Sequence, residues 1–200
     1  MARAANHLPP RHAHPLALEA SPVNRTIDML RANLDDLPPI LIPEGYRLVT
    51  AADFDDPRPV WADALNATFE STDWTPERLQ EQFVGQPQHD PHGVFFVLRG
   101  DTPVSTAFAW RDTPEETVLG RVHFVGALPA ERGKGLGRAV VVAIMHYFAD
   151  RGFQKVMLGT QGYRKPAVQL YLSLGFQPWP HDEEEARIWA EWLEKHAQPA

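Results

Sequence analysis

The chain has 200 residues, 44% of them hydrophobic, and 26 acidic against 19 basic residues give it a formal net charge of −7. This composition excludes global disorder and predicts one main core. The acidic balance argues against nucleic acid as a partner. Because the sequence contains no cysteine, disulfides, thiolate nucleophiles and cysteine-based zinc sites are excluded, and we expect no metal ion.

No stretch of the sequence approaches the roughly 18 consecutive apolar residues that span a bilayer. The first ten residues also lack the apolar core of a signal peptide. We therefore expect a cytoplasmic protein with no membrane partner.

The first 43 residues are rich in proline, which breaks helices and strands alike. We expect residues 1–24 to be a mobile tail. Ile27, Leu30 and Leu34 then follow at i, i+3 and i+7, which predicts a short amphipathic helix over residues 26–37. Residues 1–43 are thus interpreted as an extension and residues 44–200 as the main domain. The apolar stripe must dock somewhere, and a homodimer is one way to cover it.

From Gly45 onward, short β-branched and aromatic runs alternate with helical periods, which predicts an α/β or α+β layered fold. Strands are expected at residues 46–50, 94–99, 104–111, 117–127, 153–160 and 176–179. Helices are expected at residues 59–70, 76–85, 136–151 and 166–174. The acidic run at 182–185, followed by Trp189 and Trp192, predicts a further amphipathic helix that packs as a cap.

A glycine-rich segment, Arg132-Gly-Lys-Gly-Leu-Gly-Arg138, lies between a predicted strand and the helix expected at 136–151. Glycine adopts left-handed backbone angles and lets a ligand approach without a Cβ in the way. The first N–H groups of a helix lack partners, and the helix dipole is positive there. With Arg132, Lys134 and Arg138 adding charge, this segment predicts a site for an anion such as pyrophosphate.

Spacing excludes two other phosphate-binding loops. A P-loop requires glycine where Leu128 stands and Ser or Thr where Gly135 stands. The dinucleotide fingerprint requires a third glycine where Arg138 stands. A different anion-binding loop remains.

Two motifs carry a family resemblance. The segment Val125-Gly-Ala-Leu-Pro-Ala-Glu-Arg132-Gly-Lys-Gly135-Leu-Gly137-Arg-Ala139 resembles the acyl-CoA-binding motif of the GNAT superfamily of N-acetyltransferases, in which Arg132, Gly135 and Gly137 match the core pattern. The segment Ala167-Val-Gln-Leu-Tyr171-Leu-Ser-Leu-Gly-Phe176 resembles the family's second motif. The resemblance covers about residues 45–180.

The resemblance implies a mixed, mostly antiparallel central sheet that splays at its fourth strand, with helices on both faces. It also implies acetyl-CoA as co-substrate. The main chain of Val125 and Ala127 would pair with the pantetheine arm. The pyrophosphate would bind the segment that we name the cradle, namely Arg132, Gly133, Lys134, Gly135, Leu136, Gly137 and Arg138.

Tyr171 matches the family tyrosine that protonates the departing thiolate. Its spacing from Val168 and Leu172 would fit a residue that only packs the core equally well. Where the family often has an asparagine that contacts pantetheine, this chain has Arg164. That contact is therefore missing or replaced by a charge.

The strand carboxylate that some family members use as general base is replaced here by Arg121. His123 lies two residues on and therefore on the same face of the strand, and it is a candidate proton acceptor. A buried, hydrogen-bonded histidine, or a water relay to Glu70, Asp112 or Glu115, fits the sequence as well.

The resemblance implies an N-acetyltransferase that moves an acetyl or similar small acyl group from acetyl-CoA to a primary amine of a small molecule or peptide. Without cysteine, we expect direct attack and no covalent enzyme intermediate. The missing glutamate and asparagine leave a non-catalytic CoA-binding module as the alternative, and a phosphate-binding protein unrelated to CoA as a third reading. Candidate walls of the acceptor site are Trp61, Phe69, Glu70, Trp74 and Trp110.

Overall fold

The computed structural model describes residues 26–196, so the predicted tail at residues 1–24 lies outside the described part. Within that part, one sheet has seven strands in the order β2-β3-β4-β5-β6-β1-β7. The strands are β1 (Thr26–Arg31), β2 (Tyr46–Thr50), β3 (Val94–Arg99), β4 (Thr102–Trp110), β5 (Leu119–Ala127), β6 (Lys155–Gln161) and β7 (Gln177–Pro178). Neighbouring strands run antiparallel except for β5 and β6, which are parallel. The mixed, mostly antiparallel sheet is confirmed.

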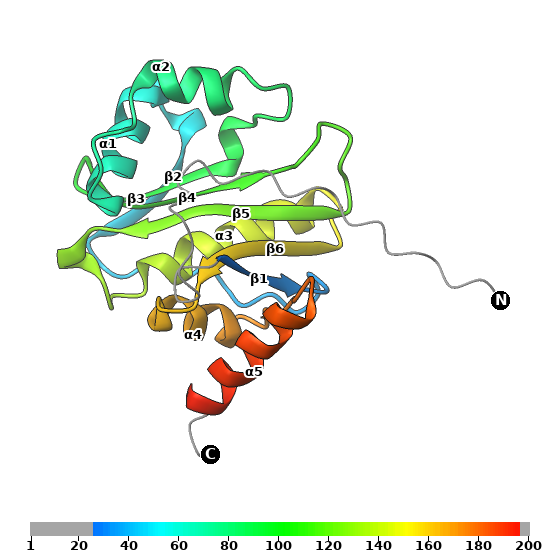
Figure 1. Cartoon of the computed structure of the whole chain (residues 1–200). Coiled ribbons are helices and arrows are strands. Elements are labelled where there is room, and N and C mark those ends of the chain that lie inside the picture. The colour runs from blue at the N-terminus through cyan, green and yellow to red at the C-terminus, as the bar shows by residue number, and fades with distance from the viewer. Residues whose placement is uncertain (1–25, 197–200) are drawn as a thin grey trace.

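Helices cover both faces of the sheet (Figure 1). On one face lie α1 (Pro57–Phe69) and α2 (Pro76–Leu79), and α2 continues into a π-helical turn at Gln80–Val84. On the other face lie α3 (Leu136–Asp150) and α4 (Lys165–Ser173), joined by α5 (Glu183–His196). Single 3₁₀ turns occur at Ala51–Asp53, Pro91–Gly93 and Pro129–Glu131. The C-terminal helix packs as predicted, with Trp189 and Trp192 buried in the core beneath α3.

Strand β3, which lies inside the sheet between β2 and β4, shows why the sheet needs helices on both faces. Phe95 and Val97 point into the core on the α3 side, whereas Phe96 and Leu98 point into the core under α1. Successive side chains of a strand alternate between the two faces. A strand covered on both faces therefore reads as a continuous apolar run, as residues 94–98 do.

The amphipathic helix predicted over residues 26–37 is wrong, because Thr26–Arg31 forms strand β1. This strand pairs with β6 from Thr26↔Gln161 to Arg31↔Val156. Ile27 and Met29 enter the core, so the alternation of a strand, and not a helical stripe, buries them. The division drawn at residue 43 thus separates β1 from the sheet to which it belongs. The stripe that prompted the homodimer expectation is not formed.

Among the described residues, no helix is long and apolar enough to cross a membrane.

Candidate functional site

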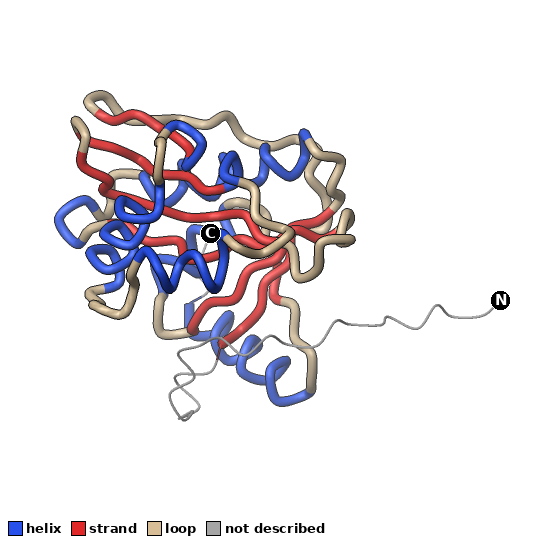
Figure 2. The backbone as a smooth tube through the Cα atoms, turned by 90° about the horizontal axis from the view of Figure 1, so that it is seen from above, coloured by secondary structure: helices blue, strands red, loops and turns tan. Residues whose placement is uncertain are grey.

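The parallel strands β5 and β6 are paired over only part of their length. They pair from Leu119↔Lys155 to Arg121↔Met157, and the structure gives no pairing between them beyond that point in the described chain. Figure 2 shows the strands diverging into two groups. The splay implied by the family resemblance is therefore present at β5.

The end of β5 turns hydrogen-bonding groups toward this splay. The N–H of Leu128 donates to the carbonyl of Val104 at 2.9 Å. In an antiparallel ladder, neighbouring residues point their N–H and C=O groups to opposite sides of the strand. The N–H and C=O of Ala127, which lies opposite Ser105, are therefore directed away from β4. The Ala127 carbonyl accepts from Nε of Arg132 at 3.3 Å.

A β-bulge lies just upstream on β5. Phe108 faces His123 and Thr106 faces Gly126, so one residue of β4 is opposite two of β5. Phe124, which lies in the bulge, has a φ of +50°. Such a bulge disrupts the ladder and redirects the side chains that follow. Here it brings His123 and Phe124 to the same face, where both rings stack on Phe108.

The cradle begins α3 with its main chain exposed. Gly133 and Gly135 have φ values of +79° and +84°, a region that strains any residue with a Cβ. A Cβ built at either glycine would meet no atom within 4 Å. Gly135 is the N-cap, and no side chain caps the helix. The first N–H groups of α3 therefore have no side-chain cap at the positive end of the helix dipole.

The buried carboxylate of Glu131, which directly precedes the cradle, binds the cradle residue Lys134. The Glu131 side chain is 1% exposed and lies 2.7 Å from the Arg99 guanidinium and 2.8 Å from the Lys134 ammonium. It also accepts the Tyr46 hydroxyl at 2.6 Å. Hydrogen bonds from Lys134 and Tyr46 lower the pKa of Glu131, and the Glu131 carboxylate raises the pKa of Lys134.

Sequence reasoning missed Glu131 and Tyr46. The spacing of Glu131 and Lys134 at i, i+3 was the one local signal of their contact, whereas Tyr46 and Arg99 come from the distant strands β2 and β3. The remaining cations of the cradle lie at its rim. Arg132 is 3.6 Å from exposed Glu70, and Arg138 contacts the Ser173 hydroxyl at 3.4 Å.

Tyr171 lies on α4 and is 5% exposed, with its ring 6.0 Å from that of Phe176. Burial raises its pKa to about 12, and Arg164 opposes this shift. The phenol is therefore protonated at neutral pH and able to donate a proton. Packing and acid roles are compatible for this residue, because only its hydroxyl is needed for chemistry.

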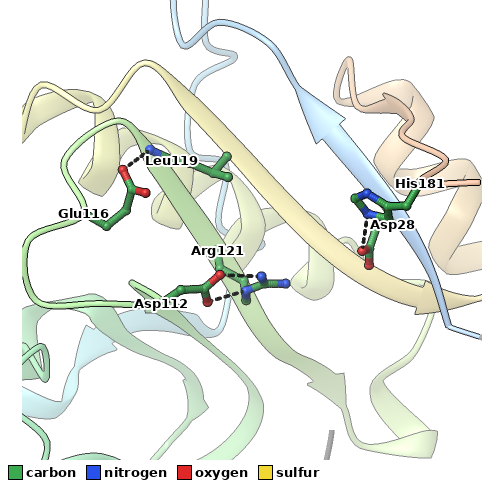
Figure 3. A network of polar contacts seen from close by, with 6 residues as sticks. All are labelled: Asp28, Asp112, Glu116, Leu119, Arg121 and His181. Carbon is green, nitrogen blue, oxygen red and sulfur yellow. Dashed lines mark hydrogen bonds and ion pairs between the residues drawn. The ribbon is translucent and has the colours of Figure 1, made fainter. Parts of the chain in front are cut away.

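His123 and Arg121 share the α1 face of β5. His123 is half-buried, and its ring lies 5.4 Å from that of Phe108. The Arg121 guanidinium forms two hydrogen bonds to the Asp112 carboxylate, at 2.9 and 2.7 Å (Figure 3). Arg121 therefore stands as a paired cation where the family resemblance calls for a carboxylate.

Some of the residues predicted to line the acceptor site are buried in the core, and others are exposed on the surface. Trp61 and Trp74 are buried in the core under α1 together with Phe83. Glu70 is exposed, at the left-handed C-cap of α1. Of these three, only Glu70 projects toward the cradle, through Arg132.

The site combines an uncapped helix N-terminus, which suits an anion, with a sheet that splays beside it. A family model, Acetyltransferase (GNAT) family, matches residues 58–176. A mycothiol acetyltransferase of Rhodococcus erythropolis is 34% identical over 177 residues, covering 82% of this chain and 58% of that protein. One of Thermobispora bispora is 37% identical over 164 residues, covering 77% and 54%. The chain spans little more than half the length of these curated relatives.

Solved structures agree on the fold. A GCN5-related N-acetyltransferase from Sphaerobacter thermophilus matches with a TM-score of 0.63 and 22% identity, covering 78% of this chain and 49% of that one. The chain belongs to the GNAT family of acetyltransferases. The cradle fits the pyrophosphate of the family's acetyl-CoA, because its uncapped N–H groups and its two left-handed glycines leave room for a phosphate to approach.

Proposed function

We propose that this chain is an acetyl-CoA-dependent N-acetyltransferase that acetylates a primary amine by direct attack. One observation carries the proposal: the outward main chain of Ala127 is followed, after a turn in which Arg132 donates to the Ala127 carbonyl, by the uncapped start of α3 at Gly135. The start of α3 can bind a diphosphate, and the main chain of Ala127 can bind an extended amide-containing arm. Few ligands other than a CoA thioester have both.

Each part of the site has a role in this proposal. The N–H groups of Gly133 to Arg138 bind the pyrophosphate, and Val125 and Ala127 hold the pantetheine arm as an added strand. Fixing the arm at two places orients the reactive end for attack. Gly137 is not required for packing, since a Cβ there would make only ordinary contacts, at 3.7 Å from Leu170 and 4.0 Å from Val125.

When bound, acetyl-CoA supplies an acetyl thioester to the splay. His123 takes one proton from the attacking amine, and the Tyr171 hydroxyl gives one proton to the sulfur as the C–N bond forms and the C–S bond breaks. The high pKa of Tyr171, about 12, keeps that proton in place until the thiolate forms. Tyr171 then regains a proton from solvent.

The names of the relatives support an acceptor class. Proteins named mycothiol acetyltransferase match most of this chain, so small mycothiol-related amines are the first acceptors to test. The rival function is a CoA-binding module without catalysis, and the pairing of Arg121 with Asp112 at the usual position of the base favours it.

Thiol release tests the proposal directly. The chain contains no cysteine, so a thiol reagent detects free CoA without background from the protein. Release that depends on an added amine supports the enzyme. Thermal stabilisation by CoA without release, across a broad panel of amines, supports the module, and the absence of both responses contradicts any CoA function.

A further inference from the structure

On the face of the sheet opposite α3, outside the area that α1 and α2 cover, lie the polar residues Asp28 and His181. Those helices pack over β3 and β4 through the aromatic core that contains Trp61 and Phe96. Further along the sheet, Gly159 of β6 is exposed. Asp28 of β1 lies directly opposite Gly159 in the antiparallel ladder.

The carboxylate of Asp28 stands beside this glycine. A Cβ built at Gly159 would lie 3.0 Å from Oδ1 of Asp28 and 3.0 Å from Thr26. Asp28 Oδ2 is 2.9 Å from Nε2 of His181, and the side chains are 12% and 20% exposed. The carboxylate is thus largely desolvated but within reach of a ligand.

His181 is itself held in place. Its backbone N–H donates to the buried Glu185 carboxylate at 2.8 Å, and its ring packs against Trp179 with centroids 4.9 Å apart. A carboxylate fixed by such a partner keeps one geometry, which a binding group requires.

The register places this pair beside the splay. Pairing between β5 and β6 ends at Arg121↔Met157. His123 lies two residues beyond Arg121, and Gly159 two residues beyond Met157, so each stays on the same face of its strand as the last paired residue. Figure 3 shows the Arg121–Asp112 and Asp28–His181 pairs on one side of the sheet, with β6 between them. On the opposite side, α3 and α4 fill the space with apolar core. An acceptor therefore has access to the splay from the face that carries Asp28.

We propose that Asp28, held by His181, binds the ammonium group of the acceptor above Gly159, and that this ammonium releases one proton to solvent before the neutral amine attacks. The chemistry selects a small cationic primary amine, because an ammonium donates strong charge-assisted hydrogen bonds to a carboxylate of fixed geometry. Gly159 leaves the space that any larger residue would fill. This inference rests on the proposed function, since it assigns the acceptor side of the same site.

Kinetics of two variants test the assignment. Asp28→Asn keeps the shape and a hydrogen bond to His181 but removes the charge, and Gly159→Ala narrows the space beside the carboxylate. We expect the KM for D-glucosamine, tyramine or spermidine to rise about 10- to 100-fold, the scale of one charged hydrogen bond. The KM for acetyl-CoA should not change. Asp101→Asn is the matched control, because Asp101 is exposed and pairs only with exposed Arg47.

The outcomes separate this inference from the proposed function. If the wild type acetylates an amine and both variants keep its acceptor KM, the acceptor site lies elsewhere while the function stands. If the wild type releases no thiol with any amine of the broad panel, the proposed function fails. Calorimetric titration of the same amines into CoA-saturated protein then decides the site. Binding that Asp28→Asn abolishes supports it, whereas equal binding to both proteins, or none to the wild type, overturns it.

Discussion

The Lys134 ammonium donates a hydrogen bond to the buried Glu131 carboxylate at 2.8 Å. This contact ties the middle of the cradle to the turn that precedes it. The positive charge of Lys134 is therefore shared with an internal anion, and the open main-chain N–H groups at Gly133 and Gly135 are left as the principal anion donors.

Replacing Glu131 by Gln should lower the melting temperature at pH 7 and weaken CoA binding, because Arg99 and Lys134 lose their shared anion. The pKa of Glu131 is depressed. Its stabilising effect is thus fully present above the ordinary carboxyl pKa of about 4.3 and is lost as the pH falls through the lower folded value. The melting temperatures of wild type and variant should therefore converge as the pH is lowered from 7 to 3. A difference in melting temperature that persists unchanged at low pH would contradict the assignment.

Gly135→Val should weaken CoA affinity at least tenfold and destabilise the protein by about 1–2 kcal/mol, the cost of a side chain in the left-handed region. Gly45→Val is the matched control, because Gly45 has nearly the same φ, +83°, and equally open surroundings. Both variants should lose similar stability in urea denaturation. Only the cradle variant should lose affinity in calorimetry, and equal affinity in the two would argue against the cradle.

Tyr171→Phe should bind acetyl-CoA nearly unchanged but turn over about 10²- to 10⁴-fold more slowly, the range for loss of a general acid. Since the pKa of Tyr171 is about 12, its ionisation should leave no inflection in the wild-type rate below about pH 11. Tyr163→Phe serves as control, because Tyr163 is exposed and lies just before α4. Unchanged turnover in Tyr171→Phe would leave that residue a packing role alone.

His123→Asn should lower kcat while leaving the KM for acetyl-CoA unchanged, because the imidazole is proposed to accept a proton and not to bind the co-substrate. Steady-state kinetics of the wild type and the variant measure both constants. If kcat is unchanged in the variant, a different group accepts the proton.

Gly120→Ala should destabilise the protein by about 1–3 kcal/mol through overpacking. The added Cβ would lie 2.5 Å from the Phe148 ring, which is fixed in the core beneath α3. Gly137→Ala is the comparison, since its Cβ would make only ordinary contacts, the nearest at 3.7 Å. In urea denaturation of the unliganded proteins, the free energy of unfolding of Gly120→Ala should be well below that of both wild type and Gly137→Ala.

The sequence by itself determined the local elements of the site. The glycines of the cradle, the apolar periods of α3 and the continuous run of β3 depend on neighbours a few residues away. Their backbone angles and faces can therefore be predicted from spacing alone. The family motifs added the splay, and they imply a general-acid role for Tyr171, which stays a prediction.

The tertiary structure decided what depends on distant partners. Thr26–Arg31 fits a helical period as well as a strand, and hydrogen bonds to residues 156–161 make it a strand. In the same way Tyr46 and Arg99 meet Glu131, and Asp28 meets Gly159 and His181. Strand pairing satisfies backbone groups across segments more than a hundred residues apart, and no local pattern records which segments will meet.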